Sequence, residues 1–312
     1  MTTNTIASVM ITGANTGIGK ELARQLGLRD TITRVVLACR NADKAAAARA
    51  ELVTATGRDI YDVVIIDTGD LRSSEQAALA LTEPVDAVVM NAGGFGGKNP
   101  SALNGFGATH MFAINVLGHA VLLNTMITEH KLSKVAILAG SEAARGAAQM
   151  RIPRPVFEST SVEELTSVID GTFFATRKYN DSIGYSYTKY IAALWMSAEA
   201  RRHPELRLLT VSPGGTAGTD AARDLPAIAR FGFDKILMGM IGPALKFAHP
   251  LGVGAARHLT ALDDPTFRSG VFYGSPARKL TGPLVDQGEF FPDLTNPTYQ
   301  DNAYRAVHRF ID

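Results

Sequence analysis

The chain has 312 residues, of which 46% are hydrophobic and 20% are charged, a composition typical of a soluble globular protein. Its 31 basic and 30 acidic side chains give a formal net charge of +1, which provides no electrostatic case for a nucleic-acid or anionic-membrane partner. The single cysteine, Cys39, excludes an internal disulfide and a cysteine-rich zinc site.

The amino-terminal stretch, MTTNTIASVMITGA, lacks a basic region followed by an apolar core, so we expect no secretory signal. We also expect no membrane span, because the closest candidate, residues 227–248, is interrupted by four charged side chains. These features and the single cysteine predict a cytoplasmic protein.

Short apolar runs alternate with longer helical patterns along the chain. Strands are predicted at residues 6–12, 34–39, 62–66, 86–90, 134–139, 206–212 and 270–273. Helices are predicted near residues 18–28, 41–55, 72–81, 104–130, 184–203 and 251–262. Strands that are apolar on both faces and separated by helices are typical of a parallel sheet covered on both sides. The predicted fold is therefore α/β: one Rossmann-type doubly wound parallel sheet of about seven strands in a single domain, residues 1–312.

A glycine-rich turn, TGANTGIGKELARQL, follows the first predicted strand. Gly13, Gly17 and Gly19 have the spacing G-x3-G-x-G, and glycine lets a backbone approach a pyrophosphate closely. The helix that follows offers free N–H groups and the positive end of its dipole to phosphates. A turn in this position predicts a dinucleotide site, and it lacks the lysine–serine/threonine pair of a P-loop.

The ends of the second and third predicted strands indicate which dinucleotide is bound. NAD sites place an acidic residue near the end of the second strand, where this chain has Cys39 and then Arg40. An arginine can pair with a 2′-phosphate, so we interpret Arg40 as a signal for NADP(H), the alternative being a strand-edge residue that points to water. Asp67 follows the third strand and is either an acceptor for the adenine amino group or a turn residue.

Two tyrosines and a lysine occur in the run YSYTK at residues 185–189. Tyr185 and Lys189 are four residues apart and share a helix face, whereas Tyr187 has no such partner and is predicted to be a packing residue. A neighbouring ammonium group lowers the pKa of a phenol, so the spacing suggests an acid/base pair. The seven histidines show no spacing that predicts a metal site.

The chain resembles the short-chain dehydrogenase/reductase family. The matching residues occur in the family's order: TGANTGIG at 12–19, Asp67, NAG at 91–93, Asn115, Ser141, YSYTK at 185–189 and PG at 213–214. The three-residue gap in the glycine motif resembles the oxidoreductase branch. The runs LACRN, NVLGH and YSYTK look most like retinol-dehydrogenase-like and protochlorophyllide-reductase-like members.

The resemblance implies a role for each matched residue. Tyr185 would be the general acid or base, and Lys189 would lower its pKa and hold the nicotinamide ribose. Ser141 would hydrogen-bond the substrate oxygen, and Asn115 would hold a water in a proton relay. The implied cofactor-binding residues are Gly13, Asn15, Thr16, Gly17, Ile18, Gly19, Arg40, Asp67, Asn91, Ala92, Gly93, Tyr185, Lys189, Pro213, Gly214 and Thr216.

Three segments depart from the shortest family pattern. Residues 142–184 form an insertion before Tyr185, expected at the active-site rim, in which SVEELTSVI predicts a helix with a capping box from Ser161 to Glu164. Residues 215–250 are expected to form a substrate loop, where either Thr216 or Thr219 meets the cofactor amide. Residues 276–312 form a carboxyl-terminal extension.

These features predict an NADP(H)-dependent oxidoreductase that transfers hydride to or from a carbonyl or alcohol group of a medium-to-large apolar small molecule. Two alternatives remain open: reduction of a C=C bond by the same residue pair, and a non-catalytic protein that senses NADP. The expected assembly is a monomer or a homodimer.

Overall fold

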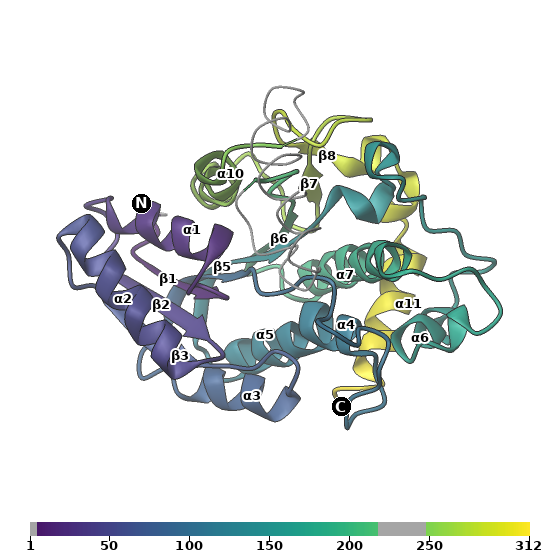
Figure 1. Cartoon of the computed structure of the whole chain (residues 1–312), viewed down its shortest axis with the longest axis horizontal. Helices are drawn as coiled ribbons and strands as arrows, with labels where there is room; N and C mark the ends of the chain where they lie inside the picture. Colours follow the sequence, from purple (N-terminus) through teal and green to yellow (C-terminus); the bar gives the residue numbers. More distant parts are fainter. Residues whose placement is uncertain (1–4, 218–247) are drawn as a thin grey trace.

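Eight strands form one sheet in the computed structural model, which describes residues 5–217 and 248–312 (Figure 1). Their order across the sheet is β3-β2-β1-β4-β5-β6-β7-β8; β1 to β7 pair in parallel, and β8 pairs antiparallel with β7. The strands are β1 (Ser8–Thr12), β2 (Arg34–Cys39), β3 (Tyr61–Ile65), β4 (Val85–Met90), β5 (Leu132–Ala139), β6 (Arg207–Val211), β7 (Phe272–Gly274) and β8 (Val285–Asp286). The chain order reverses between β1 and β4, so a crevice is expected at the carboxyl ends of these two strands.

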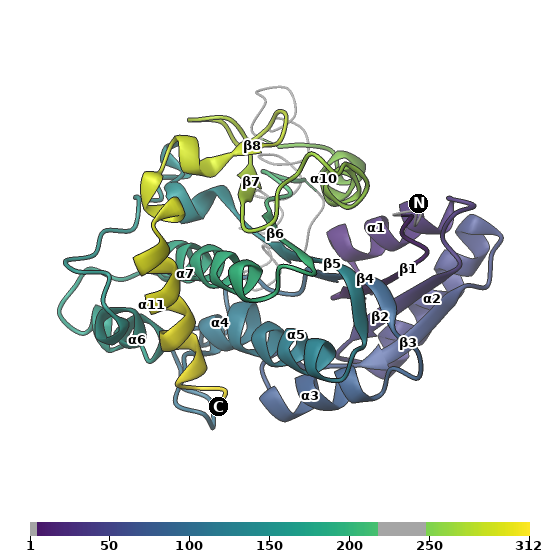
Figure 2. The ribbon, with the colours of Figure 1, turned by 180° about the vertical axis from the view of Figure 1, so that it is seen from behind.

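Helices cover both faces of the sheet (Figures 1 and 2). They are α1 (Gly17–Gly27), α2 (Ala42–Thr56), α3 (Leu71–Leu79), α4 (His110–Phe112), α5 (Gly118–Thr128), α6 (Val162–Ile169), α7 (Asp181–Arg202), α10 (Leu251–Asp263) and α11 (Pro297–His308). Helices α1, α2 and α10 close one apolar core, and α3, α5, α7 and α11 close the other. The predicted doubly wound α/β fold is therefore confirmed.

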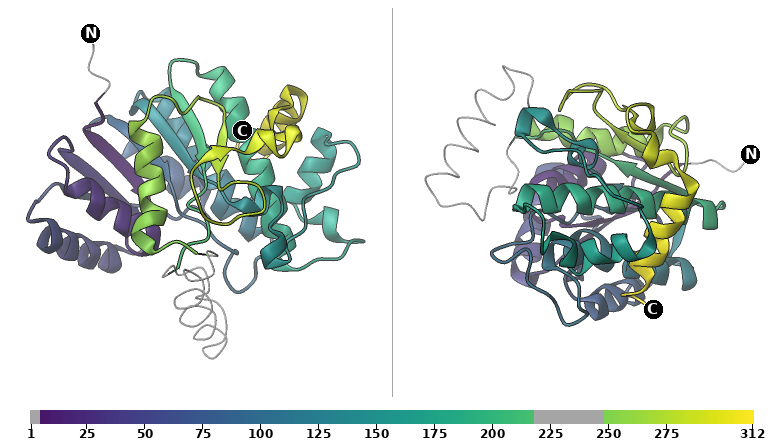
Figure 3. Two further views of the ribbon diagram at one scale, coloured as in Figure 1. Left: turned by 90° about the horizontal axis from the view of Figure 1, so that it is seen from above. Right: turned by 90° about the vertical axis from the view of Figure 1, so that its right-hand side faces the viewer.

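The seven predicted strands are all present, with ends that differ by up to two residues. Strand β8 and helix α11 were not predicted. The two residues of β8 are too few to show alternation. Helix α11 buries Gln300, Ala303, Ala306 and Val307, of which only Val307 is a large apolar side chain. Figure 3 shows α11 beside α7 at the end of the molecule away from α2.

One long helical segment was predicted over residues 104–130, and the structure gives it a shorter and less regular form. It begins at His110 as α4, passes through a π-helical stretch at Ala113–Leu117 and continues as α5. The stretch His110–Thr128 is long and apolar enough to cross a membrane by length and composition, although we expected no run of this kind in the chain. Because 67% of its most apolar window is buried inside the protein, this stretch has the character of a core helix. The closest candidate in the sequence, residues 227–248, lies outside the described part of the chain except for its last residue.

The insertion contains the predicted capped helix, α6. Ser161 accepts a hydrogen bond from the Glu164 backbone N–H at 3.2 Å, which confirms the forward half of the capping box. In a full capping box the Glu164 carboxylate would accept from the Ser161 backbone N–H. Here it accepts instead from the backbone N–H groups of residues 158–160, each at 2.8 Å. The carboxylate thereby fixes the turn that leads into the helix.

A buried carboxylate joins α11 to α7. Glu199 is 1% exposed and accepts from the Trp195 indole N–H at 2.9 Å, and its Oε1 lies 3.3 Å from Nε2 of His308. The other ring nitrogen of His308 lies 3.1 Å from Asp312. Burial opposes a charge on the ring, but the hydrogen bonds to Glu199 and Asp312 outweigh it and raise the pKa of His308.

We predict that this contact makes folding stability depend on pH. A raised pKa means that the protonated ring favours the folded chain; its contribution is present below the ordinary value of about 6.5 and is lost as pH rises through the raised value. His308→Gln should therefore lower the free energy of unfolding by about 1 kcal/mol near pH 6 and by less at alkaline pH. Thermal unfolding of both proteins at the two pH values measures this, with His110→Gln as an exposed-histidine control. An equal deficit at both pH values would contradict the prediction.

Candidate active site

The glycine turn has the conformation that its sequence predicts. Gly13 and Gly17 have φ angles of +69° and +55°, which disfavour any residue with a side chain. A Cβ on Gly19 would lie 2.5 Å from the Gly13 carbonyl oxygen, so glycine is required there for close packing. Helix α1 begins at Gly17, and its amino end therefore faces the turn formed by residues 13–16.

Thr12, the last residue of β1, ties this turn to the segment that follows β4. Its hydroxyl accepts from the Ala92 backbone N–H at 2.9 Å, and its carbonyl accepts from the Asn91 side chain at 3.0 Å. The same hydroxyl lies 3.0 Å from Nε2 of His119, whose pKa burial lowers to about 4, so the ring is neutral. Sequence reasoning missed the roles of Thr12 and His119. Thr12 lies beside the glycine turn and His119 lies four residues after Asn115, but neither residue type indicates a site by itself.

Asn115 lies in the π-helical stretch and reaches the loop after β4. Its amide group donates to the carbonyls of Gly94 at 2.7 Å and Met111 at 2.8 Å, and its oxygen accepts from the Gly94 N–H at 3.2 Å. A Cβ on Gly93 would lie 2.5 Å from that oxygen, which accounts for the glycine. These contacts give Asn115 a role in shaping the loop, and its implied role in holding a water stays a prediction.

Arg40 and Asp67 meet beside the ends of β2 and β3. The Arg40 guanidinium lies 4.0 Å from Oδ2 of Asp67, and 70% of the Arg40 side chain is exposed. Oδ1 of Asp67 accepts from the Gly69 N–H at 3.0 Å, a contact that supports its interpretation as a turn residue. Its alternative role toward adenine stays a prediction.

Ser141, Tyr185 and Lys189 come together at the carboxyl end of β5. The Ser141 hydroxyl accepts from the Ala143 N–H at 3.2 Å and hydrogen-bonds the Tyr185 phenol. Lys189 is one helical turn after Tyr185 on α7; its ammonium group donates to the Ala139 carbonyl at 2.9 Å and lies 5.5 Å from the centre of the Tyr185 ring. The structure thus brings together the three residues that sequence reasoning assigned to catalysis.

The expected lowering of the Tyr185 pKa is not found. Burial, and secondarily the charge of Glu142, raise the pKa of Tyr185 to about 12, although the hydrogen bond from Ser141 opposes this. Burial also lowers the pKa of Lys189 to about 8. The Lys189 ammonium group is directed to the Ala139 carbonyl, and burial is the largest influence on the Tyr185 pKa. At neutral pH the phenol is protonated, which suits a general acid.

A buried ion pair that sequence reasoning missed joins the ends of three strands. Glu142 follows Ser141 directly and is 3% exposed; its carboxylate accepts from the Ser212 hydroxyl at 2.6 Å and the Ser275 N–H at 2.8 Å. Arg257 of α10 lies 3.8 Å from this carboxylate and donates to the Ser212 carbonyl at 2.8 Å. In the sequence, Glu142 follows Ser141 and Ser212 precedes the Pro213-Gly214 motif, so both lie beside predicted site residues. Arg257 lies in no motif, and the sequence did not indicate that it pairs with Glu142.

The segment after β6 continues this edge. Gly214 has a φ of +74°, and a Cβ there would lie 2.7 Å from the Leu280 carbonyl. Thr216 donates to the Pro213 carbonyl at 3.1 Å and pairs with His249. Thr216 is therefore packed beside the predicted nicotinamide pocket, whereas Thr219 lies outside the described residues.

Apolar side chains surround the Tyr185 phenol. The Tyr185 ring packs against a small cluster of buried residues from the insertion and the extension: Ala143, Ala147, Ile152 and Leu280. The Phe95 ring lies beside it, with ring centres 4.8 Å apart. Residues of the insertion therefore pack against Tyr185, and the expectation that the insertion forms the rim of the active site stays a prediction.

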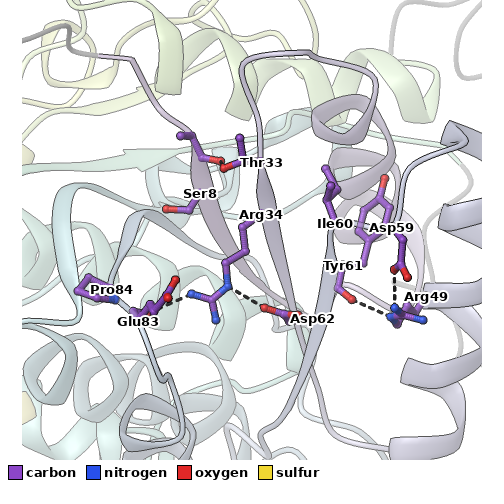
Figure 4. Close-up of a pocket in the computed structure, with 11 residues that line it drawn as sticks. Ser8, Thr33, Arg34, Arg49, Asp59, Ile60, Tyr61, Asp62, Glu83 and Pro84 are labelled. Carbon is purple, nitrogen blue, oxygen red and sulfur yellow. Dashed lines mark hydrogen bonds and ion pairs between the residues drawn. The ribbon is translucent and has the colours of Figure 1, made fainter.

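A separate cavity of about 470 Å³ lies at the opposite, amino-terminal ends of β1, β2 and β3 (Figure 4). Four of its charged side chains form two ion pairs, Arg34 with Asp62 and Arg49 with Asp59. These ion pairs explain why the four charged side chains lie together there without requiring a ligand. Among the described residues, no group of three or more histidine, cysteine or acidic side chains is placed to hold a metal ion.

Comparisons with known proteins agree with this geometry. The model of the short chain dehydrogenase family matches residues 7–146. Human retinol dehydrogenase 13 is 26% identical over 289 residues, which cover 90% of this chain and 80% of that protein. Human retinol dehydrogenase 11 is 34% identical over 128 residues, which cover 40% of this chain and only 39% of that protein.

A solved structure shares the fold. A short chain dehydrogenase from Burkholderia cenocepacia, crystallised in complex with NADP, superposes with a TM-score of 0.58 at 19% identity, covering 85% of this chain and 94% of that chain. The chain is therefore similar to the short chain dehydrogenase family over residues 7–146 and to a retinol dehydrogenase over most of its length.

Proposed function

We propose that this protein is an NADP(H)-dependent oxidoreductase that acts on the carbonyl or alcohol group of a medium-to-large apolar substrate. The observation that carries the proposal is the convergence of Ser141, Tyr185 and Lys189 at the carboxyl edge of the sheet, next to the glycine turn. A binding protein that performs no chemistry has no need of this trio.

The residues present fit a dinucleotide. The positive φ angles of Gly13 and Gly17 leave the backbone free of side chains in front of the amino end of α1, where a pyrophosphate would be held. Gly94 has open space where a Cβ would project, so the loop after β4 also leaves room beside the turn. The residues that would hold the nicotinamide end are Lys189, Pro213, Gly214 and Thr216.

The proposed chemistry divides between cofactor and protein. When bound, the cofactor supplies or accepts the hydride. The Ser141 hydroxyl orients the substrate oxygen, and Tyr185 donates its phenolic proton to that oxygen as negative charge develops on it. The Lys189 ammonium group, 5.5 Å from the ring centre, would hold the nicotinamide ribose, and solvent returns the proton to Tyr185. In the direction of alcohol oxidation the same groups act in reverse.

The preference for NADP over NAD is proposed from Arg40. Its guanidinium is largely exposed and only loosely paired with Asp67, so it is available to a 2′-phosphate. The residue before it is Cys39, which cannot accept from the ribose hydroxyls as a carboxylate does.

We predict that Tyr185→Phe folds normally and binds NADPH but loses turnover by about 10²–10⁴-fold, because the general acid is removed. Steady-state oxidation of NADPH with a panel of ketones measures this. Tyr187→Phe is the matched control on the same helix, since its hydroxyl contacts only the backbone of Val156. Turnover by Tyr185→Phe within a few-fold of the wild type would overturn the assignment.

We predict that kcat/KM is about 10–100-fold higher with NADPH than with NADH. This ratio corresponds to the roughly 1.5–3 kcal/mol that a hydrogen bond to a charged group contributes. Cys39→Asp combined with Arg40→Ile should move the preference toward NADH. Arg72→Ile, which removes another exposed arginine on α3, should leave the preference unchanged. Equal kcat/KM values for both cofactors in the wild type would contradict the proposed role of Arg40.

We predict that kcat/KM rises along a series of ketones with growing apolar groups. Apolar contacts around Tyr185 support this expectation, and the second predicted wall, residues 215–250, lies mostly outside the described residues. Steady-state kinetics on the series provide the measurement. A flat or falling series, with best activity on small polar carbonyl compounds, would rule out an apolar substrate.

A further inference from the structure

We propose that an arginine-lined cleft beside the catalytic tyrosine binds an anionic group, a carboxylate or a phosphate, at the far end of the substrate. The cleft has a volume of about 630 Å³ and lies between the start of the insertion and residues 277–290. This inference rests on the proposed function and adds to it: the apolar carbonyl compound would also carry a negative charge.

Four arginines and no acidic residue line the cleft: Arg145, Arg151, Arg154 and Arg278. Within the described ranges, 5–217 and 248–312, none of the four forms an ion pair with a carboxylate. The same cleft has apolar side chains, among them Ile152 and Phe290. A cationic and partly apolar cleft suits an amphipathic anion.

Two of these arginines build the cleft. Arg145 is buried and donates to the carbonyls of Ser275, Pro276 and Lys279 at 3.0–3.1 Å. Arg154 donates to the Arg145 and Phe290 carbonyls, both at 3.2 Å. Their hydrogen bonds to neutral carbonyls fix the two segments together without neutralising either charge.

The other two arginines remain available to a ligand. Arg151 and Arg278 are exposed, and in the structure described neither guanidinium has a hydrogen-bond or ion-pair partner. Both have left-handed backbone conformations, with φ angles of +55° and +57°, which are costly for residues other than glycine. Two exposed cations are thus held in unfavourable backbone positions that line one cleft.

The cleft is adjacent to the reacting centre and remote from Arg40. Ile152 lines the cleft and also belongs to the small cluster that packs against Tyr185. Arg40 follows β2, which is separated from β7 by four strands. An anion in the cleft would therefore belong to the substrate and not to the adenosine end of the cofactor.

The test compares two substrates that differ only in charge: a long-chain keto acid and its methyl ester, each assayed with NADPH. The wild type should favour the acid by about 10-fold or more in kcat/KM, because a guanidinium–carboxylate bond forms only with the acid. In Arg151→Asn combined with Arg278→Asn, the ratio should fall to about one. Asparagine tolerates the left-handed conformation, so the substitutions remove charge without a backbone penalty. Arg305→Asn, an exposed arginine on α11, should leave the ratio as in the wild type.

A binding measurement separates this proposal from the proposed function. Calorimetric titration with dodecanoate, dodecyl phosphate and dodecanol should show binding of one or both anions that is weakened about 10-fold or more in the double variant, with the alcohol unaffected. The stronger anion identifies carboxylate or phosphate as the preferred group. Anion binding without turnover of either substrate would support the cleft and overturn the proposed function. Equal turnover of acid and ester by the wild type, or anion binding unchanged in the double variant, would overturn the cleft.

Discussion

The Lys189 ammonium group is buried between α7 and the end of β5, and the geometry of the candidate site depends on how it is held. A buried cation requires hydrogen bonds, and Lys189 donates to the Ala139 carbonyl at 2.9 Å. This bond fixes the rotation of α7 against the sheet edge. Because Tyr185 is one turn earlier on the same face, the bond also places the phenol beside Ser141, two residues beyond Ala139. Burial keeps the phenol protonated and brings the pKa of the lysine to about 8.

The remaining parts of the site are held at the same edge by close backbone approaches and by buried polar bonds. Glycine permits the approaches at Gly19 and Gly93, where a Cβ would lie 2.5 Å from an oxygen atom. Beyond β4 in the sheet, the Glu142 carboxylate joins the ends of β5, β6 and β7, and the Arg257 guanidinium offsets its charge. A pair of this kind is costly to break, since either partner alone would leave an uncompensated buried charge.

The insertion and the carboxyl-terminal extension add two segments to the sheet and its covering helices. The extension supplies α11, which packs on α7 and is joined to it through Glu199 and His308 (Figure 2). The start of the insertion meets residues 277–290 to form the arginine-lined cleft next to the apolar cluster around Tyr185. The sheet therefore carries the proposed hydride-transfer site, while these two segments shape the surface beside it.

The sequence by itself determined the sheet and the identity of the candidate trio Ser141, Tyr185 and Lys189, because these depend on local signals. Apolar runs of strand length, the glycine spacing at Gly13, Gly17 and Gly19, and the four-residue offset of Tyr185 and Lys189 are each visible within a few residues. Only the tertiary structure decided that Lys189 bonds to Ala139, that Glu142 meets Arg257, and that Arg151 and Arg278 line one cleft. These contacts join segments far apart in the chain, and burial sets the pKa values at Tyr185 and Lys189. Neither the long-range pairing nor the burial of a side chain is encoded in a local pattern, so sequence reasoning expected a lowered tyrosine pKa where the folded chain raises it.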